Sequence, residues 1–181
     1  MSERRFWLRD KTAPSHRALE GMVGPLDTIP AYSHFVEGLY RGRQPVESWL
    51  KNLAWPELFK DWRPILIGPA LAKDLADLDR PLPPLAPFTP PGATVSDLLG
   101  VLYVLEGSSL GARVVLRQAL ALGLDAGFGA RHLALQASDG GWPHFVRLLD
   151  SADHPDMERV GRAAVATFDA MHQAMSGHVV A

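Results

Sequence analysis

No cysteine occurs among the 181 residues of this chain. Disulfide bonds, thiolate nucleophiles, iron–sulfur clusters and cysteine-based zinc sites are therefore excluded. Any metal ion must be held by histidine, by carboxylates or within a prosthetic group.

An excess of positive charge is also missing. The chain has 18 Lys and Arg residues against 20 Asp and Glu residues, which gives a net charge of -2. A nucleic-acid-binding protein would usually carry a basic face, so we expect no nucleic-acid partner. The polar N-terminus does not resemble a signal peptide, and no apolar run approaches the roughly 20 residues of a membrane span. These features predict a cytoplasmic protein that does not enter a membrane.

Strand-like alternation, internal repeats and charge blocks are absent as well. Apolar residues instead recur at helical spacing, and 47% of residues are hydrophobic. The length suits one domain, residues 1–181, with an all-α fold. A proline-dense stretch at residues 81–91 is interpreted as a long surface loop within that domain.

The helix boundaries follow from caps and breakers. The first helix is expected to begin near Thr12 or to bend at Pro14, and to end at Gly24 and Pro25. Thr94 or Ser96 is expected to cap the strongest helix. That helix is expected at residues 98–122, and a glycine-rich turn at 123–129 ends it. The remaining helices are expected at residues 30–40, 49–59, 69–78, 142–149 and 155–175, with the first two separated by a break at Gly42 and Pro45.

One segment with possible chemistry lies near the N-terminus. His16 falls on the same helical stripe as Leu8 and Thr12, and Glu20 follows one turn later. An imidazole with one nitrogen on an acceptor is how proteins present an iron ligand. A core histidine bonded to a neighbouring carboxylate fits the same spacing and is the commoner arrangement.

A second such segment spans residues 102–112. Gly107 and Gly111 lie in mid-helix, where each glycine costs about 1 kcal/mol relative to alanine. With Gly100 and Ser108 they form a strip of small residues on one helical face. A rigid planar ligand could lie against this strip, and close packing of another helix explains it equally well.

Taken together, the two segments resemble one family. Thr12-x-x-x-His16-x-x-x-Glu20 is similar to the proximal helix of heme oxygenases, and the run Tyr-Val-Leu-Glu-Gly-Ser-Ser-Leu-Gly-Ala from Tyr103 to Ala112 is similar to the distal helix of the bacterial members. The second motif is the more specific one. The resemblance implies a single compact all-α domain with heme between a proximal helix and a kinked distal helix.

The resemblance also implies roles for residues of the first segment. His16 would be the proximal iron ligand, and Glu20 would orient and polarise its ring. Arg9 and Tyr103 match positions that pair with the heme propionates. Thr12, the first residue of the motif, is placed with them among the heme-binding residues.

For the distal helix the family implies catalytic roles. Gly107 and Gly111 would let the helix bend close to the porphyrin. The main chain or hydroxyls of Ser108 and Ser109 would hold water that delivers protons. Ser108 stands where the animal enzymes have an aspartate, so this water would be anchored differently.

The implied reaction cleaves heme, which is both cofactor and substrate, with O2 and electrons from an external reductase or reductant. Biliverdin, carbon monoxide and ferrous iron are the family products, and a bilin-binding photoreceptor is a possible downstream partner. A monomer is expected. Two alternatives stay open: a heme carrier or sensor on the same fold, and a helical partner-binding domain without heme. A di-iron site is disfavoured because Glu-x-x-His pairs are absent.

Overall fold

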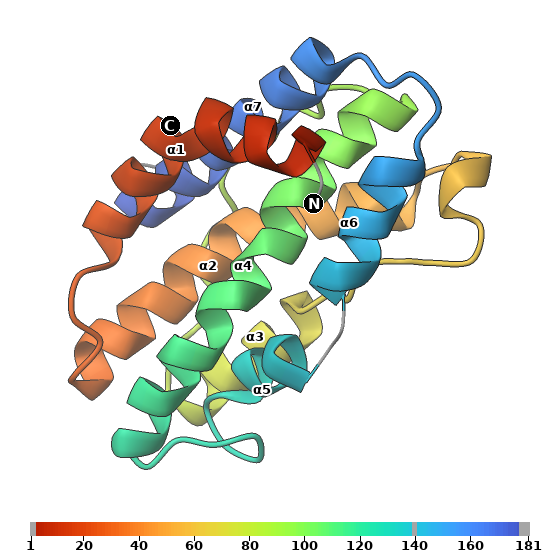
Figure 1. Cartoon of the computed structure of the whole chain (residues 1–181). Helices are drawn as coiled ribbons and strands as arrows, with labels where there is room; N and C mark the ends of the chain where they lie inside the picture. Colours follow the sequence, from red (N-terminus) through yellow and green to blue (C-terminus); the bar gives the residue numbers. More distant parts are fainter. Residues whose placement is uncertain (1–2, 139–140, 178–181) are drawn as a thin grey trace.

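The structure is a computed structural model that describes residues 3–138 and 141–177. Within these ranges the chain forms α-helices, one short 3-10 helix and no strand, which confirms the all-α prediction (Figure 1). The elements are α1 (Glu3–Val23), α2 (Ile29–Lys51), the 3-10 helix η1 (Glu57–Phe59), α3 (Gly68–Asp77), α4 (Val95–Ala121), α5 (Arg131–Ser138), α6 (Gly141–Ser151) and α7 (Met157–Ser176).

Helix α4 runs through the middle of the molecule, as Figure 1 shows. It packs along α7 and also contacts α5 and α6. Helix α7 packs in turn against α1 and α2, and α3 contacts α2 and α5. Both helices of the predicted site, α1 and α4, therefore rest on α7.

The start of α4 is fixed as the sequence predicted. The Thr94 hydroxyl accepts a hydrogen bond from the Asp97 amide, and the Asp97 carboxylate accepts from the Thr94 amide, which completes a capping box. Arg159 of α7 also donates to this carboxylate at 2.7 Å. The contact ties the beginning of α4 to α7.

One expectation about α4 was wrong. By length and hydropathy this helix could cross a membrane, although no apolar stretch was expected to be long enough. However, 56% of its most apolar window is buried within the protein. Burial of this kind is what a core helix of a soluble domain requires.

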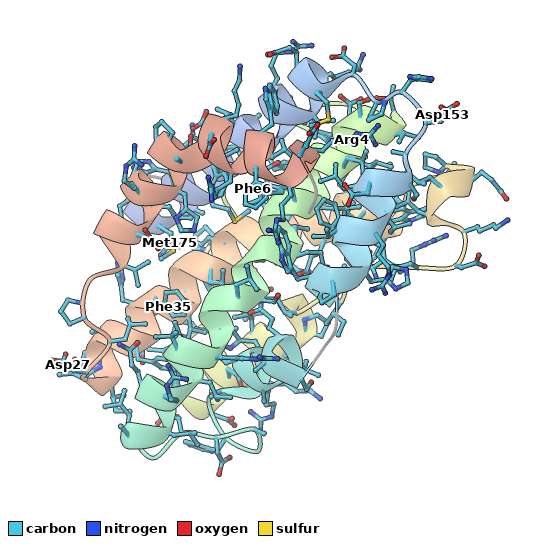
Figure 2. The ribbon with its side chains drawn as sticks, viewed as in Figure 1. Arg4, Phe6, Asp27, Phe35, Asp153 and Met175 are labelled. Carbon is cyan, nitrogen blue, oxygen red and sulfur yellow. The ribbon has the colours of Figure 1, made fainter. Side chains whose placement is uncertain are left out.

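Of the two expectations for α1, a start near Thr12 or a bend at Pro14, the first is wrong. The helix begins at Glu3 and continues through Pro14. Arg4 anchors its first turn by donating to the carbonyls of Leu149 and Ala152 at 2.7 and 2.9 Å, at the end of α6 (Figure 2). Pro14 is exposed, so the carbonyl that loses its usual donor can be hydrated. The predicted end is confirmed, since Gly24 has a φ of 62°.

Helix α2 corrects a second boundary. The sequence predicted a break at Gly42 and Pro45, whereas one helix spans Ile29–Lys51. Proline at position 45 offers no amide to the Arg41 carbonyl. That carbonyl instead accepts the Ala86 amide at 3.2 Å, from the proline-dense loop. The loop therefore satisfies the group that the proline leaves unpaired.

The predicted helix at residues 49–59 is wrong beyond Lys51, where α2 ends, and only the 3-10 helix η1 follows at Glu57–Phe59. Pro56 lies between the two and disfavours helical geometry at the residue before it. Helices α3, α6 and α7 and the proline-dense loop lie where they were predicted. Helix α5 was not predicted. Gly140 and His178 lie outside the described residues.

Candidate functional site

His16 is not a core histidine. Leu8 and Thr12 are buried on their side of α1, and the Thr12 hydroxyl donates to the Leu8 carbonyl. One turn later the His16 side chain is 57% exposed. Its Nδ1 lies 3.3 Å from Oε2 of Glu20, and the centres of its ring and of the Phe168 ring of α7 are 5.9 Å apart in a T-shaped arrangement. The imidazole is thus oriented on one side and accessible from outside.

Tyr103 marks the point where α4 meets α1. Its side chain is buried and packs on Trp142 and Phe145 of α6. Burial raises the pKa of the Tyr103 hydroxyl, while a hydrogen bond with Thr12 and the positive charge of Arg9 act in the opposite direction. The structure thus brings Tyr103 and Thr12 together, as a common heme-binding surface requires.

Beyond this meeting point both helices become exposed. One turn after Thr12 comes His16, and one turn after Tyr103 comes Gly107. On α4 the next residues of the same face are apolar and open: Leu110 is 60% exposed and Val114 is 50% exposed. Such exposed apolar surface on a core helix indicates a binding surface.

The glycines of α4 fall into two groups. A Cβ on Gly100 would lie 2.3 Å from the Val160 carbonyl oxygen of α7, so this glycine serves helix packing. A Cβ on Gly107 would make only an ordinary 3.5 Å contact with Trp142, and one on Gly111 would meet nothing within 4 Å. Close packing of another helix therefore explains Gly100, and it does not explain Gly107 and Gly111.

The two distal serines turn back onto their own helix. Ser108 Oγ donates to the Leu105 carbonyl at 2.6 Å, and Ser109 Oγ donates to the Glu106 carbonyl at 2.7 Å. Bonds of this kind weaken the helical ladder and favour bending. Ser108 also accepts from Gln136 of α5 at 2.8 Å. Proton delivery by these serines stays a prediction, and their hydroxyl protons are committed to helix carbonyls.

Arg9 does not reach Tyr103 directly. Its guanidinium pairs with Asp10 at 2.9 Å on the surface and lies 5.0 Å from the centre of the Phe6 ring. An exposed ion pair of this kind contributes little to stability, so another anion can replace Asp10 as the partner of Arg9. A role toward a propionate remains a prediction.

A buried ion pair below α4 was not foreseen from the sequence. Arg43 and Glu47 of α2 are 3% and 1% exposed, and their side chains meet at 2.9 Å. Arg43 also donates to the Leu105 carbonyl at 3.3 Å, and Glu47 accepts the amides of Ile67 and Gly68 at the start of α3. Arginine and glutamate spaced by four residues are common on helix surfaces, so the spacing alone gives no signal of burial.

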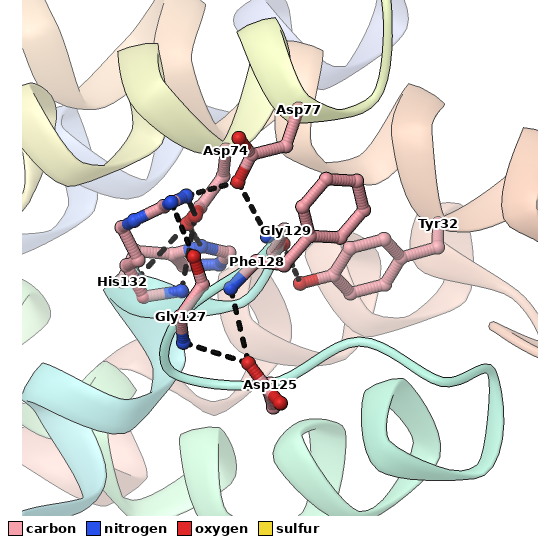
Figure 3. Close-up of polar contacts among 9 residues, drawn as sticks. Tyr32, Asp74, Asp77, Asp125, Gly127, Phe128, Gly129 and His132 are labelled. Atoms are coloured by element: carbon pink, nitrogen blue, oxygen red, sulfur yellow. Dashed lines mark hydrogen bonds and ion pairs between the residues drawn. The ribbon is translucent and has the colours of Figure 1, made fainter.

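A second buried cluster joins α3 to α5 (Figure 3). His132 is fully buried, and its Nδ1 lies 2.8 Å from Asp74 Oδ2. Burial lowers the pKa of His132 against the opposing effect of Asp74. The neutral ring donates from Nδ1, which leaves Nε2 as an acceptor without a partner in the structure. Arg131 pairs with Asp74 and Asp77 beside it.

Among the described residues no group of three or more His, Asp or Glu side chains could hold a metal ion.

The chain is similar to proteins that are named heme oxygenases. It is 34% identical over 170 residues to heme oxygenase PigA of Pseudomonas aeruginosa, which covers 90% of this chain and 84% of that protein. It is 32% identical over 104 residues to a heme oxygenase of Xanthomonas campestris, over 52% of this chain and 62% of that one. The fold matches the crystal structure of the NO- and CO-bound heme oxygenase from Neisseria meningitidis with a TM-score of 0.78 at 24% identity, over 98% and 94% of the two chains. No protein-family model matches the chain.

Proposed function

The chain belongs to the heme oxygenase family, and we propose that it binds heme between α1 and α4 and cleaves the ring to biliverdin, carbon monoxide and ferrous iron. One observation carries the proposal. The exposed imidazole of His16 and the open surface at Gly107 and Gly111 each lie one turn or more beyond the contact of Thr12 with Tyr103. A flat ligand held by His16 would meet a helix backbone without side chains in its way.

The donor set fits heme. His16 offers one imidazole nitrogen while the other lies 3.3 Å from the Glu20 carboxylate, and a carboxylate partner of this kind would fix the ring and raise its basicity as a ligand. The apolar side chains of Leu110 and Val114 suit the porphyrin face. Arg9 and Tyr103 lie near the same end of the surface and would receive a propionate.

When bound, heme supplies the iron centre that activates O2, with electrons from an external reductase or reductant. The contribution of α4 is to bring its backbone close to the ring at Gly107 and Gly111 and to limit access from that side. Water held by the main chain around Ser108 and Ser109 would supply protons. A monomeric, cytoplasmic enzyme that supplies biliverdin, for example to a bilin-binding photoreceptor, completes the proposal.

A spectroscopic titration tests the proposal. Purified protein is titrated with hemin, and ascorbate is then added in air. We expect a Soret band that saturates at one heme per chain and then decays into broad red biliverdin absorption. His16→Ala is expected to lose tight binding, whereas His172→Ala, an exposed position on α7, serves as the matched control.

Two results would contradict the proposal. A Soret band that persists through reduction in air would indicate a heme carrier. The absence of a Soret band with the unmodified chain would mean that the protein does not bind heme. Equal binding by His16→Ala and His172→Ala would leave the reaction possible and would refute His16 as the ligand.

A further inference from the structure

Two side chains from outside α4 hold the turn that precedes its open surface. Gln136 of α5 is buried, and its Nε2 donates to Ser108 Oγ at 2.8 Å. The Ser108 hydroxyl in turn donates to the Leu105 carbonyl at 2.6 Å. Arg43 of α2 donates to the same carbonyl at 3.3 Å. One carbonyl of α4 is therefore connected to α2 directly and to α5 through Ser108.

The anchor on the α2 side is rigid. Arg43 is buried with Glu47, whose carboxylate also accepts the first amides of α3. Removal of either partner would leave a buried charge uncompensated. Substitution of Arg43 would therefore test the fold rather than the site. Gln136 is neutral and lies on α5, so its substitution leaves no buried charge and should disturb the fold less.

The held segment is the part of α4 with the least stiffness of its own. Gly107 and Gly111 have low helix propensity, and the hydroxyls of Ser108 and Ser109 donate to backbone carbonyls of α4 in competition with the hydrogen bonds of the helix. Outside contacts must then decide where this backbone lies. A cavity of about 10 Å³, room for one water molecule, adjoins Gln136 and Ser109.

We propose that Gln136 is a positioning residue that, together with Arg43, sets how closely the backbone from Gly107 to Gly111 approaches the ligand. This inference rests on the proposed function. Because the chain segment over the ring limits which edge of the heme can be attacked, a change in its position changes the ratio of biliverdin isomers. Gln136 acts through Ser108 and does not itself touch the ligand.

The test combines hydrogen exchange without heme and product analysis with heme. Gln136→Met keeps the length of the side chain and removes the hydrogen bond. We expect amide exchange of residues 107–114 in the heme-free protein to rise about two- to tenfold, as loss of one buried hydrogen bond allows. Exchange at residues 95–102, next to the capping box, should stay unchanged. Biliverdin from the variant should show a changed isomer ratio.

Two further variants sharpen the test. Ser138→Ala removes a hydroxyl on the same helix that only donates to the exposed Leu135 carbonyl, so it should behave as the unmodified protein. The double variant of Gln136→Met with Ser108→Ala should exchange no faster than Ser108→Ala alone, because Gln136 acts through that hydroxyl.

Three results would overturn the inference: unchanged exchange at residues 107–114, a rise spread over the whole chain, or a local rise with an unaltered isomer ratio. Failure of the proposed function is separately visible. If hemin does not bind, exchange in the heme-free protein still decides whether Gln136 holds α4.

Discussion

Gly111→Ala is expected to stabilise the heme-free protein while it weakens heme binding. Alanine is favoured over glycine in a helix interior by about 1 kcal/mol. The new methyl group would meet nothing within 4 Å, so no packing cost opposes this gain. For a chain of this size the gain corresponds to a rise in Tm of about 2–4 °C. Heme binding should suffer because the methyl group stands on the surface that the porphyrin would cover.

The loss of affinity can be bounded from packing energies. Insertion of a methyl group into a well-packed contact typically costs about 1–3 kcal/mol, which corresponds to a roughly five- to 150-fold weaker hemin affinity. Thermal unfolding without heme and hemin titration of the same preparation measure the two effects. Opposite signs for stability and affinity are the signature of a residue retained for a ligand.

Gly100→Ala is the matched control on the same helix. Its Cβ would lie 2.3 Å from the Val160 carbonyl oxygen, so α7 must shift and the heme-free protein should lose about 1–3 kcal/mol. If Gly111→Ala lowered the Tm, the space around that residue would not be open as described. If it raised the Tm and left hemin affinity unchanged, the reasoning that places heme on this face would be refuted.

Three further outcomes are expected. Burial lowers the pKa of His132 in the folded protein, so the unfolded chain binds a proton first and the free energy of unfolding should fall as pH drops below about 6.5. The pKa of Asp74 is also lowered in the folded protein, so protonation of this residue in the unfolded chain should cause a further loss below about pH 3.8. Urea unfolding between pH 7.5 and 5.5 should show the first loss, and His132→Asn should make stability less dependent on pH in this range. Thr94→Ala should cost about 1 kcal/mol in thermal unfolding through loss of the capping box with Asp97, and no change would mean that the cap is dispensable. Tyr103→Phe should leave the fold intact and weaken hemin affinity, and equal affinity would remove its hydroxyl from the proposed propionate contact.

Local signals predicted most of the fold. The capping pattern at Thr94 and the spacing of α3 are readable because the partners lie within a few residues of one another. Pro45 could not be read in this way. It was expected to break α2, and the helix continues because Ala86, far along the chain, donates to the Arg41 carbonyl. A proline shows which carbonyl loses its donor and does not show what replaces it.

Helix α5 shows a second limit. Its residues Arg131–Ser138 are few for a stable isolated helix, and the preceding glycines mark a turn. Its first amides, those of Arg131 and His132, are held by Asp74 of α3, which acts as a capping group from another element. A sequence pattern cannot include such a partner, so the helix and the burial of His132 were both missed.

The site shows the same division between local and distant information. The motif around His16 and the glycines of α4 were recognisable, because the chemistry of a ligand site depends on residue types at fixed spacing. Gly100 and Gly111 nevertheless look alike in sequence, and only the structure separates the glycine that accommodates α7 from the glycine that faces open space. No sequence pattern marks Gln136, since its proposed role depends on a hydrogen bond from α5 to the Ser108 hydroxyl of α4. The residues that we propose to touch the heme are thus readable from motifs, and the residue that we propose to position them became visible only once the helices were packed.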